Sequence, residues 1–415
     1  MTTTPRSSLT RRSLLGATAA GALLSATGPA AGLTAGRAAA AGRAAPGPPG
    51  ARPGLDPGRL RAAVADLDHP PATAAQLQVS GSVGRWYGSS GVADLRSGRP
   101  VRPDDRVRIG SITKLFVATV LLQLVAEGRV HPGTPVQRCL PGLLPAGFAP
   151  ITLTQLLNHT SGLPDGRGWP DMSTPERVFE HRFDRWTPEQ LVATVTWAPE
   201  LKFTPGTVQE YRGTNYVLAA MVIERLTGRP YGEEVAARLL RPLGLHGTSV
   251  PGDRRHIPGR HVHGYRRMSD GTLRDITVFD PSSSWGEGEM TSTTADLTRF
   301  THALFRGELL PPELLRMMST LPPGEVRMAD GGPARYGAGL QTVEVNGFTF
   351  WGKTGEFEGY ASFTFATLDL ERCMVLSFNP ERRDRSQELM SLRVAEAVTA
   401  GGPARRAPRA AAVRR

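Results

Sequence analysis

The residue types at Ser111 and Lys114 could perform nucleophilic catalysis together. They belong to the segment Gly110-Ser111-Ile112-Thr113-Lys114, which opens an apolar stretch typical of a helix. Residues i and i+3 share one helix face, so the serine hydroxyl and the lysine amine can meet. The positive end of the helix and partial burial would lower the pKa of the lysine until it can accept the serine proton. The alternative is a capping serine followed by a surface lysine.

A second segment whose residue types could take part in catalysis is Lys353-Thr354-Gly355, which follows the apolar residues 347–351. Residues of a strand could present the lysine and the threonine to one edge of a cleft. The glycine would let a substrate approach the backbone.

The lysine count favours a chemical role for both segments. Of 49 basic residues only three are lysine, namely Lys114, Lys202 and Lys353. Arginine does not release its proton in proteins, whereas lysine can. Two of the three lysines therefore stand where a base or a tunable cation is expected, and we attribute Lys202 to chance.

Several further segments, in the same order, resemble those of a known family. The resemblance covers most of the chain from residue 107 to residue 379, at residues 107–114, 156–163, 205–207 with Tyr211, 214–216, 241–245, 290–293 and 353–355. The family contains class C β-lactamases, secreted serine D-alanyl-D-alanine carboxypeptidases and related esterases, and the chain resembles the carboxypeptidase branch most. The resemblance implies a β-lactamase/transpeptidase-like fold and an acyl-enzyme mechanism.

The resemblance also implies a third catalytic group, Tyr211. A Tyr-x-Asn motif is usual there, whereas this chain reads Tyr211-Arg212-Gly213 and lacks the asparagine. The missing amide is expected to bind the acyl carbonyl of the substrate. A tyrosine between two ammonium groups would have a lowered pKa and could activate water.

The remaining site residues follow from the same resemblance. It places the oxyanion hole at the backbone N–H groups of Ser111 and Glu356, and the substrate-binding residues at Lys353, Thr354, Gly355 and Trp285, although Trp285 could equally be a packing residue. The Glu356 side chain would repel a substrate carboxylate. Gln341 stands where the carboxypeptidases have an arginine, and Lys353, where many relatives have histidine, would restore some positive charge.

These residues predict an exported serine hydrolase, D-alanyl-D-alanine carboxypeptidase-like and acting on cell-wall peptides. An esterase or a β-lactamase-like hydrolase is the alternative, and a non-catalytic relative that binds penicillin or peptides is the second alternative. We expect no cofactor and no metal, because His256, His261 and His263 lack a pattern that completes a zinc site. The turn at residues 158–162 makes His159 structural.

The elements that would position these groups can be placed from hydrophobic periodicity. We expect a helix near Leu60, strand-like alternation over Gln76–Gly91 and helices over Ile112–Gly128 and Asn215–Gly228. Further predicted elements are strands at 343–350, 360–365 and 374–379 and a closing helix at 389–399. Strands at both ends with helices between them predict an α/β (α+β) fold, an antiparallel sheet flanked by helices with an inserted all-helical lobe.

The chain divides by composition into a twin-arginine signal peptide (1–41), a Pro/Gly-rich linker (42–58), a hydrolase domain (59–400) and a basic tail (401–415). The net charge of +11 comes from six arginines before Asp56 and five after residue 404. The neutral body argues against nucleic acid as a partner. We expect a secreted monomer without stable membrane insertion after signal cleavage, a small-molecule or peptide substrate, and unpaired Cys139 and Cys373.

Overall fold

The computed structural model describes residues 54–400. The predicted signal peptide, the basic tail and nearly all of the predicted linker lie outside the described residues. The first helix, α1 (Pro57–Ala65), begins inside the segment predicted as linker, because the Asp56 side chain caps it by accepting the N–H groups of Gly58 and Arg59.

A seven-stranded antiparallel sheet joins the two ends of the described chain. Strand β1 pairs with β13, so that Val79 lies opposite Met374. The predicted fold class is therefore confirmed. The strand order is β10 (Gln341–Val345), β11 (Phe348–Phe357), β12 (Tyr360–Ala366), β13 (Cys373–Pro380), β1 (Ala72–Ser80), β2 (Trp86–Asp94) and β3 (Arg99–Pro100).

Helices cover both faces of this sheet. Helices α1 and α11 (Gln387–Thr399) pack on one face, where Leu60 and Met390 share a core with Phe350. Helix α9 (Thr294–Phe305) packs on the other face, and its Phe300 stacks on Phe116 with ring centroids 4.1 Å apart. The second core continues from this face into the helical lobe.

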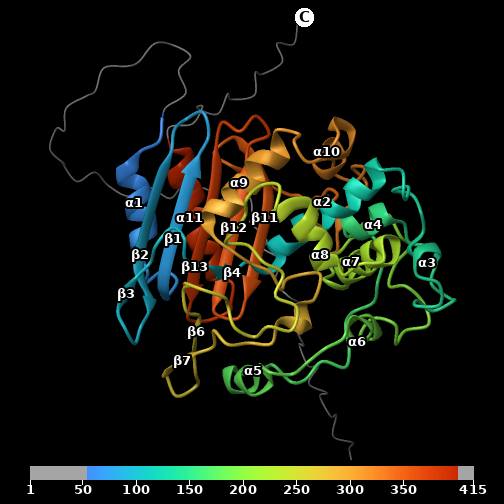
Figure 1. The fold of residues 1–415 in the computed structure, drawn as a ribbon, viewed down its shortest axis with the longest axis horizontal. Coiled ribbons are helices and arrows are strands. Elements are labelled where there is room, and N and C mark those ends of the chain that lie inside the picture. Colours follow the sequence, from blue (N-terminus) through green and yellow to red (C-terminus); the bar gives the residue numbers. More distant parts are fainter. Residues whose placement is uncertain (1–53, 401–415) are drawn as a thin grey trace, which may run out of the picture.

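The helical lobe lies beside the sheet next to β11 (Figure 1). Helix α2 follows the 3₁₀ turn η1 (Gly110–Ile112) and packs against α7. The lobe contains α2 (Thr113–Ala126), α3 (Val136–Cys139), α4 (Leu153–Leu157), α5 (Pro175–His181), α6 (Pro188–Ala193), α7 (Thr214–Thr227), α8 (Tyr231–Val235) and the π-helical turn η2 (Ala236–Leu240). The remaining elements are α10 (Pro312–Met318), the 3₁₀ turn η3 (Pro281–Ser284) and the short strands β4 (Val107–Arg108), β5 (Val208–Gln209), β6 (Tyr265–Arg267), β7 (Leu273–Asp275), β8 (Thr291–Ser292) and β9 (Arg327–Met328).

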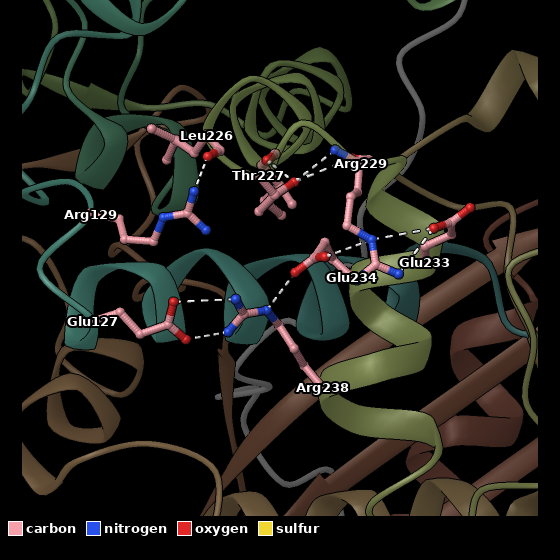
Figure 2. Close-up of polar contacts among 9 residues, drawn as sticks. Glu127, Arg129, Leu226, Thr227, Arg229, Glu233, Glu234 and Arg238 are labelled. Carbon is pink, nitrogen blue, oxygen red and sulfur yellow. Dashed lines mark hydrogen bonds and ion pairs between the residues drawn. The ribbon is translucent and has the colours of Figure 1, made fainter.

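Polar contacts fix the end of α2 that lies farthest from Ser111 (Figure 2). Arg238 bridges Glu127, the C-cap residue of α2, and Glu234 of α8, the latter at 2.7 Å. Arg129 donates to the carbonyl of Leu226 in α7. The partly exposed Arg238–Glu127 pair contributes up to about 1 kcal/mol, so it fixes geometry more than it adds stability.

Two strand predictions need correction, and both errors come from turns. Gln76–Gly91 is a hairpin, because the chain reverses between β1 and β2 at Gly81 and Gly84, with φ of 134° and 127°. The segment 343–350 is also a hairpin, closed by Asn346-Gly347 in left-handed conformations that suit this dipeptide. Residues 353–355 therefore lie within β11.

The helix predictions agree with the structure. Helix α7 ends at Gly228, which adopts φ of 71° as a C-cap.

Both cysteines are free thiols, Cys373 buried and Cys139 half-buried. Within residues 54–400, no helix has the length and apolar character needed to cross a bilayer.

Candidate active site

Ser111 lies in the 3₁₀ turn that connects β4 to α2, at a half-exposed position. The preceding Gly110 has φ of 50°, and a Cβ there would lie 2.4 Å from the backbone nitrogen of Glu356. Only glycine allows both this conformation and this close approach. The turn therefore brings the backbone before Ser111 into contact with the end of β11.

Two predicted side chains converge on the Ser111 hydroxyl. Lys114 Nζ donates a hydrogen bond to Ser111 Oγ at 3.1 Å, from one turn further along the chain. Tyr211 OH donates to the same oxygen at 2.8 Å, from the segment before α7. The structure therefore brings together the three residues predicted as catalytic, although Ser111 and Tyr211 are 100 positions apart in the sequence.

A fourth residue of this cluster, Glu287, was not identified from the sequence. Lys114 Nζ donates to the Glu287 carboxylate and to its backbone carbonyl, both at 2.8 Å. Glu287 lies in the loop between η3 and β8, and its side chain is 24% exposed. The sequence signal was indirect: Gly213 replaces an expected asparagine, and this leaves space beside Lys114.

The pKa directions follow from burial. Burial lowers the pKa of Lys114, and the neighbouring Glu287 carboxylate opposes that shift. The direction expected for a lysine base is thus confirmed. Burial also lowers the pKa of Lys353 well below its ordinary value, and the charge of Lys114 adds to the shift.

The expected lowering of the Tyr211 pKa was wrong. Burial raises the pKa of Tyr211 well above its ordinary value, and the Glu287 charge raises it further. Lys114 Nζ and Lys353 Nζ do lie 5.0 and 4.9 Å from the centre of its ring, as expected. However, the lowered pKa of each lysine weakens the positive field that would stabilise a phenolate. Tyr211 is therefore a proton donor to Ser111.

Lys353 and Thr354 do not share one edge of the cleft as expected. Lys353 is buried beneath the Tyr211 ring and donates to the carbonyl of Thr354. Successive side chains of a strand point to opposite faces. Thr354 accordingly lies on the α11 side of the sheet, where it lines a small cavity and donates to Gln341 at 3.2 Å.

Gly355 and Glu356 lie where β11 runs past the end of β10. A Cβ on Gly355 would lie 2.0 Å from the carbonyl oxygen of Ile109, so the strand edge contacts the Ser111 turn directly. Burial raises the pKa of Glu356, although Arg383 lies 3.5 Å from its carboxylate and opposes the shift. This arginine offsets part of the repulsion expected between Glu356 and a substrate carboxylate.

Trp285 is half-buried and packs edge-to-face on Tyr231, with ring centroids 4.9 Å apart. It packs there at the start of the Glu287 loop, and its role in substrate binding stays a prediction. Gln341 is fully buried at the start of β10.

His159 has the structural role predicted for it. Its ring packs within 4.4 to 5.5 Å of the rings of Tyr211, Tyr216 and Tyr336. Burial lowers its pKa well below the ordinary value, so the ring is neutral. The neutral imidazole ring of His159 packs against Tyr211 and holds its ring in place.

Within residues 54–400, no group of three or more histidine, cysteine or acidic side chains is arranged to hold a metal ion. His261 and His263 stack on each other, and His263 contacts Asp275 at 2.6 Å.

This arrangement suits attack on a carbonyl carbon. Ser111 is a half-exposed residue, Lys114 can accept its proton when neutral, and Tyr211 can donate one. The backbone of Glu356 lies beside the nucleophile, where an N–H donor would stabilise a developing oxyanion.

Comparison with known proteins identifies relatives of this chain. A sequence model of the family described as Beta-lactamase matches residues 59–399. Penicillin-binding protein 4* of Bacillus subtilis is 27% identical over 338 residues, which cover 77% of this chain and 70% of that protein. A D-aminopeptidase of Cereibacter sphaeroides is 27% identical over 70% of this chain, and the match spans only 53% of that longer protein. The crystal structure of a D-stereospecific amidohydrolase from Streptomyces sp. superposes with a TM-score of 0.70 at 36% identity, covering 84% of this chain and all of that one.

Proposed function

The chain belongs to the beta-lactamase family, and from this premise we propose that it is an exported serine hydrolase that cleaves amides or esters through an acyl-enzyme on Ser111. The observation that carries the proposal is the position of Ser111 Oγ, which accepts hydrogen bonds from Lys114 at 3.1 Å and Tyr211 at 2.8 Å. Such a constellation activates a hydroxyl for acyl transfer.

The proposed reaction has two halves. Ser111 Oγ bonds to the carbonyl carbon while its proton passes to neutral Lys114. The C–N or C–O bond then breaks, and the leaving group takes a proton delivered through Lys114 or Tyr211. In the second half, water attacks the acyl ester, its proton passes back through the same groups, and the acid leaves with the Ser111 hydroxyl restored.

The charges around Ser111 favour a substrate without a carboxylate beside the scissile bond. Lys114 is paired with Glu287, and burial holds the pKa of Lys353 low. Arg383 is paired with Glu356 and Glu358, and Arg212 with Asp165 and Glu210. Each of these cations already has a carboxylate partner or a low pKa, which disfavours binding of a free D-alanine terminus.

We therefore propose amides of D-amino acids, or peptides with a free N-terminal D-residue, as the preferred substrates. The names of the D-aminopeptidase and of the D-stereospecific amidohydrolase support this choice. The D-alanyl-D-alanine carboxypeptidase-like activity is the second candidate, supported by the match to penicillin-binding protein 4* over most of the chain.

A substrate panel separates these activities. We expect kcat/KM for D-alanine p-nitroanilide to exceed that for its N-acetylated form by at least about tenfold, because the proposed substrates share a free amine and acetylation removes its charge and adds bulk. A peptide ending in D-Ala-D-Ala should be slower still. Preference for that peptide would instead establish the carboxypeptidase, and hydrolysis of p-nitrophenyl butyrate alone would establish an esterase. No turnover together with a stable penicillin adduct on Ser111, read by intact mass, would indicate a binding protein.

We propose that the chain reaches the outside of the cell by twin-arginine export, on the basis of Arg11-Arg12 before an uncharged, small-residue stretch. Replacing both arginines by lysine in the full chain is expected to retain the protein in the cytoplasmic fraction of a twin-arginine-competent host. The matched control is Arg37→Lys with Arg43→Lys, which should be exported normally. Equal export of both variants would contradict the proposal.

A further inference from the structure

Gly213 is a glycine that the local backbone does not require. It caps the start of α7 with φ of −60° and ψ of −44°, ordinary right-handed helical values that any residue adopts. Elsewhere around the site, Gly110 needs its positive φ, but Gly213 does not. Another feature must therefore account for the missing side chain.

The space beside Gly213 is occupied by the Glu287 carboxylate. A Cβ on residue 213 would lie 1.9 Å from Glu287 Oε2 and 2.3 Å from its Oε1. Since no pair of such atoms approaches so closely, a side chain at 213 and the present position of the carboxylate exclude each other. The glycine at position 213 therefore leaves the space in which the Glu287 carboxylate lies.

The loop that carries Glu287 is fixed on both sides. Glu287 N–H donates to the carbonyl of Ser284 at 3.1 Å. The buried Glu289 carboxylate accepts the Gly286 N–H at 3.0 Å and the hydroxyl of Tyr231. The Glu287 carboxylate is thus presented from a fixed loop, and its Oε2 atom accepts from Lys114.

We propose that the Glu287 carboxylate occupies the place of the amide that the Tyr-x-Asn pattern would supply at residue 213, and that Glu287 is the positioning residue that holds the Lys114 amine against Ser111. The inference rests on the proposed function, because Lys114 must be the base for its position to affect turnover. It goes beyond that function in assigning a role to a residue from a different loop.

The exchange of an amide for a carboxylate has an electrostatic consequence. An amide is neutral, whereas Glu287 raises the pKa of Lys114 against the effect of burial. The other polar or titratable groups facing Lys114 are Ser111, Tyr211, Tyr216, His159 and Lys353. Because Glu287 also raises the pKa of Lys353, loss of its charge shifts both lysines in the same direction.

A double-mutant cycle tests the assignment. Glu287→Ala removes the partner of Lys114, and Gly213→Asn displaces the carboxylate, so each single variant is expected to lower kcat by about 10²-fold. In the double variant the asparagine fills the vacated space, and kcat should recover to within about tenfold of the wild type. The matched control is Glu344→Gln, an exposed carboxylate on β10.

A pH profile and a melting curve add readouts that a merely structural role would not produce together. Glu287→Gln keeps the shape but removes the charge, so the acid limb of kcat/KM is expected to move to lower pH. Lys114 then becomes neutral, and active, at a lower pH. The thermal midpoint should fall in Gly213→Asn and recover in the double variant, and this readout does not depend on catalysis.

The outcomes separate the inference from the function on which it rests. Additive losses in the cycle, with an unmoved acid limb, would overturn the role of Glu287 while leaving Ser111-dependent hydrolysis intact. If no substrate is turned over in a Ser111-dependent way, the proposed function fails. In that case, recovery of the thermal midpoint in the double variant still supports the exchange of the two side chains, and its absence overturns it.

Discussion

Ser111→Ala is expected to lower kcat by about 10⁴-fold or more on the best substrate of the panel, the largest effect of any single change. Ser111 Oγ accepts hydrogen bonds from both Lys114 and Tyr211, so its removal takes away the oxygen on which these groups act. The residual rate would come from substrate binding and the oxyanion donors alone. Steady-state kinetics measures the loss.

The fold should survive this change, because Ser111 is half-exposed and its side chain joins no core cluster. The matched control is Ser82→Ala, an exposed serine in the turn after β1, which should retain wild-type kcat. Intact mass after incubation with an acylating substrate should show an adduct on the wild type and none on Ser111→Ala. A variant that kept both its turnover and its adduct would show that Ser111 is not the nucleophile.

Much of the site could be predicted from the sequence because its groups sit at fixed local spacings. Ser111 and Lys114 are one helical turn apart, and Gly228 ends the helix that follows Tyr211. The lysine count was informative for a physical reason. Lys114 and Lys353 are buried, where a releasable proton matters, whereas Lys202 is an exposed residue paired with Asp165 and Glu210.

The features that were not predicted from the sequence depend on tertiary packing or on turns that were not recognised. Glu287 reaches Lys114 across 173 positions, and no local pattern marks it. The turn at Asn346-Gly347 was overlooked. Lys353 and Thr354 were expected on a strand, but the alternation of strand side chains, which turns Thr354 away from Lys353, was not applied to them. The Tyr211 pKa was misjudged because counting nearby cations ignored burial, which is the larger effect.

The second large effect is expected for Lys114→Arg, which keeps the positive charge but removes the base. Arginine stays protonated in proteins, so it cannot accept the Ser111 proton. The longer, planar guanidinium must also enter a fully buried site built around an amine with three acceptors. We expect kcat to fall by about 10³-fold or more, and Lys202→Arg is the matched control that should retain activity.

The pH dependence distinguishes loss of the base from loss of packing. Burial lowers the pKa of Lys114, and only the neutral amine can take a proton, so wild-type kcat/KM should rise as the pH rises through that pKa. In Lys114→Arg the residue stays charged at every accessible pH, so the residual rate should lose this rise on the acid side. If the variant kept the same acid limb at a reduced rate, another group would be the base. Lys353, whose pKa burial lowers well below its ordinary value and which lies beside Tyr211, would be the first to examine.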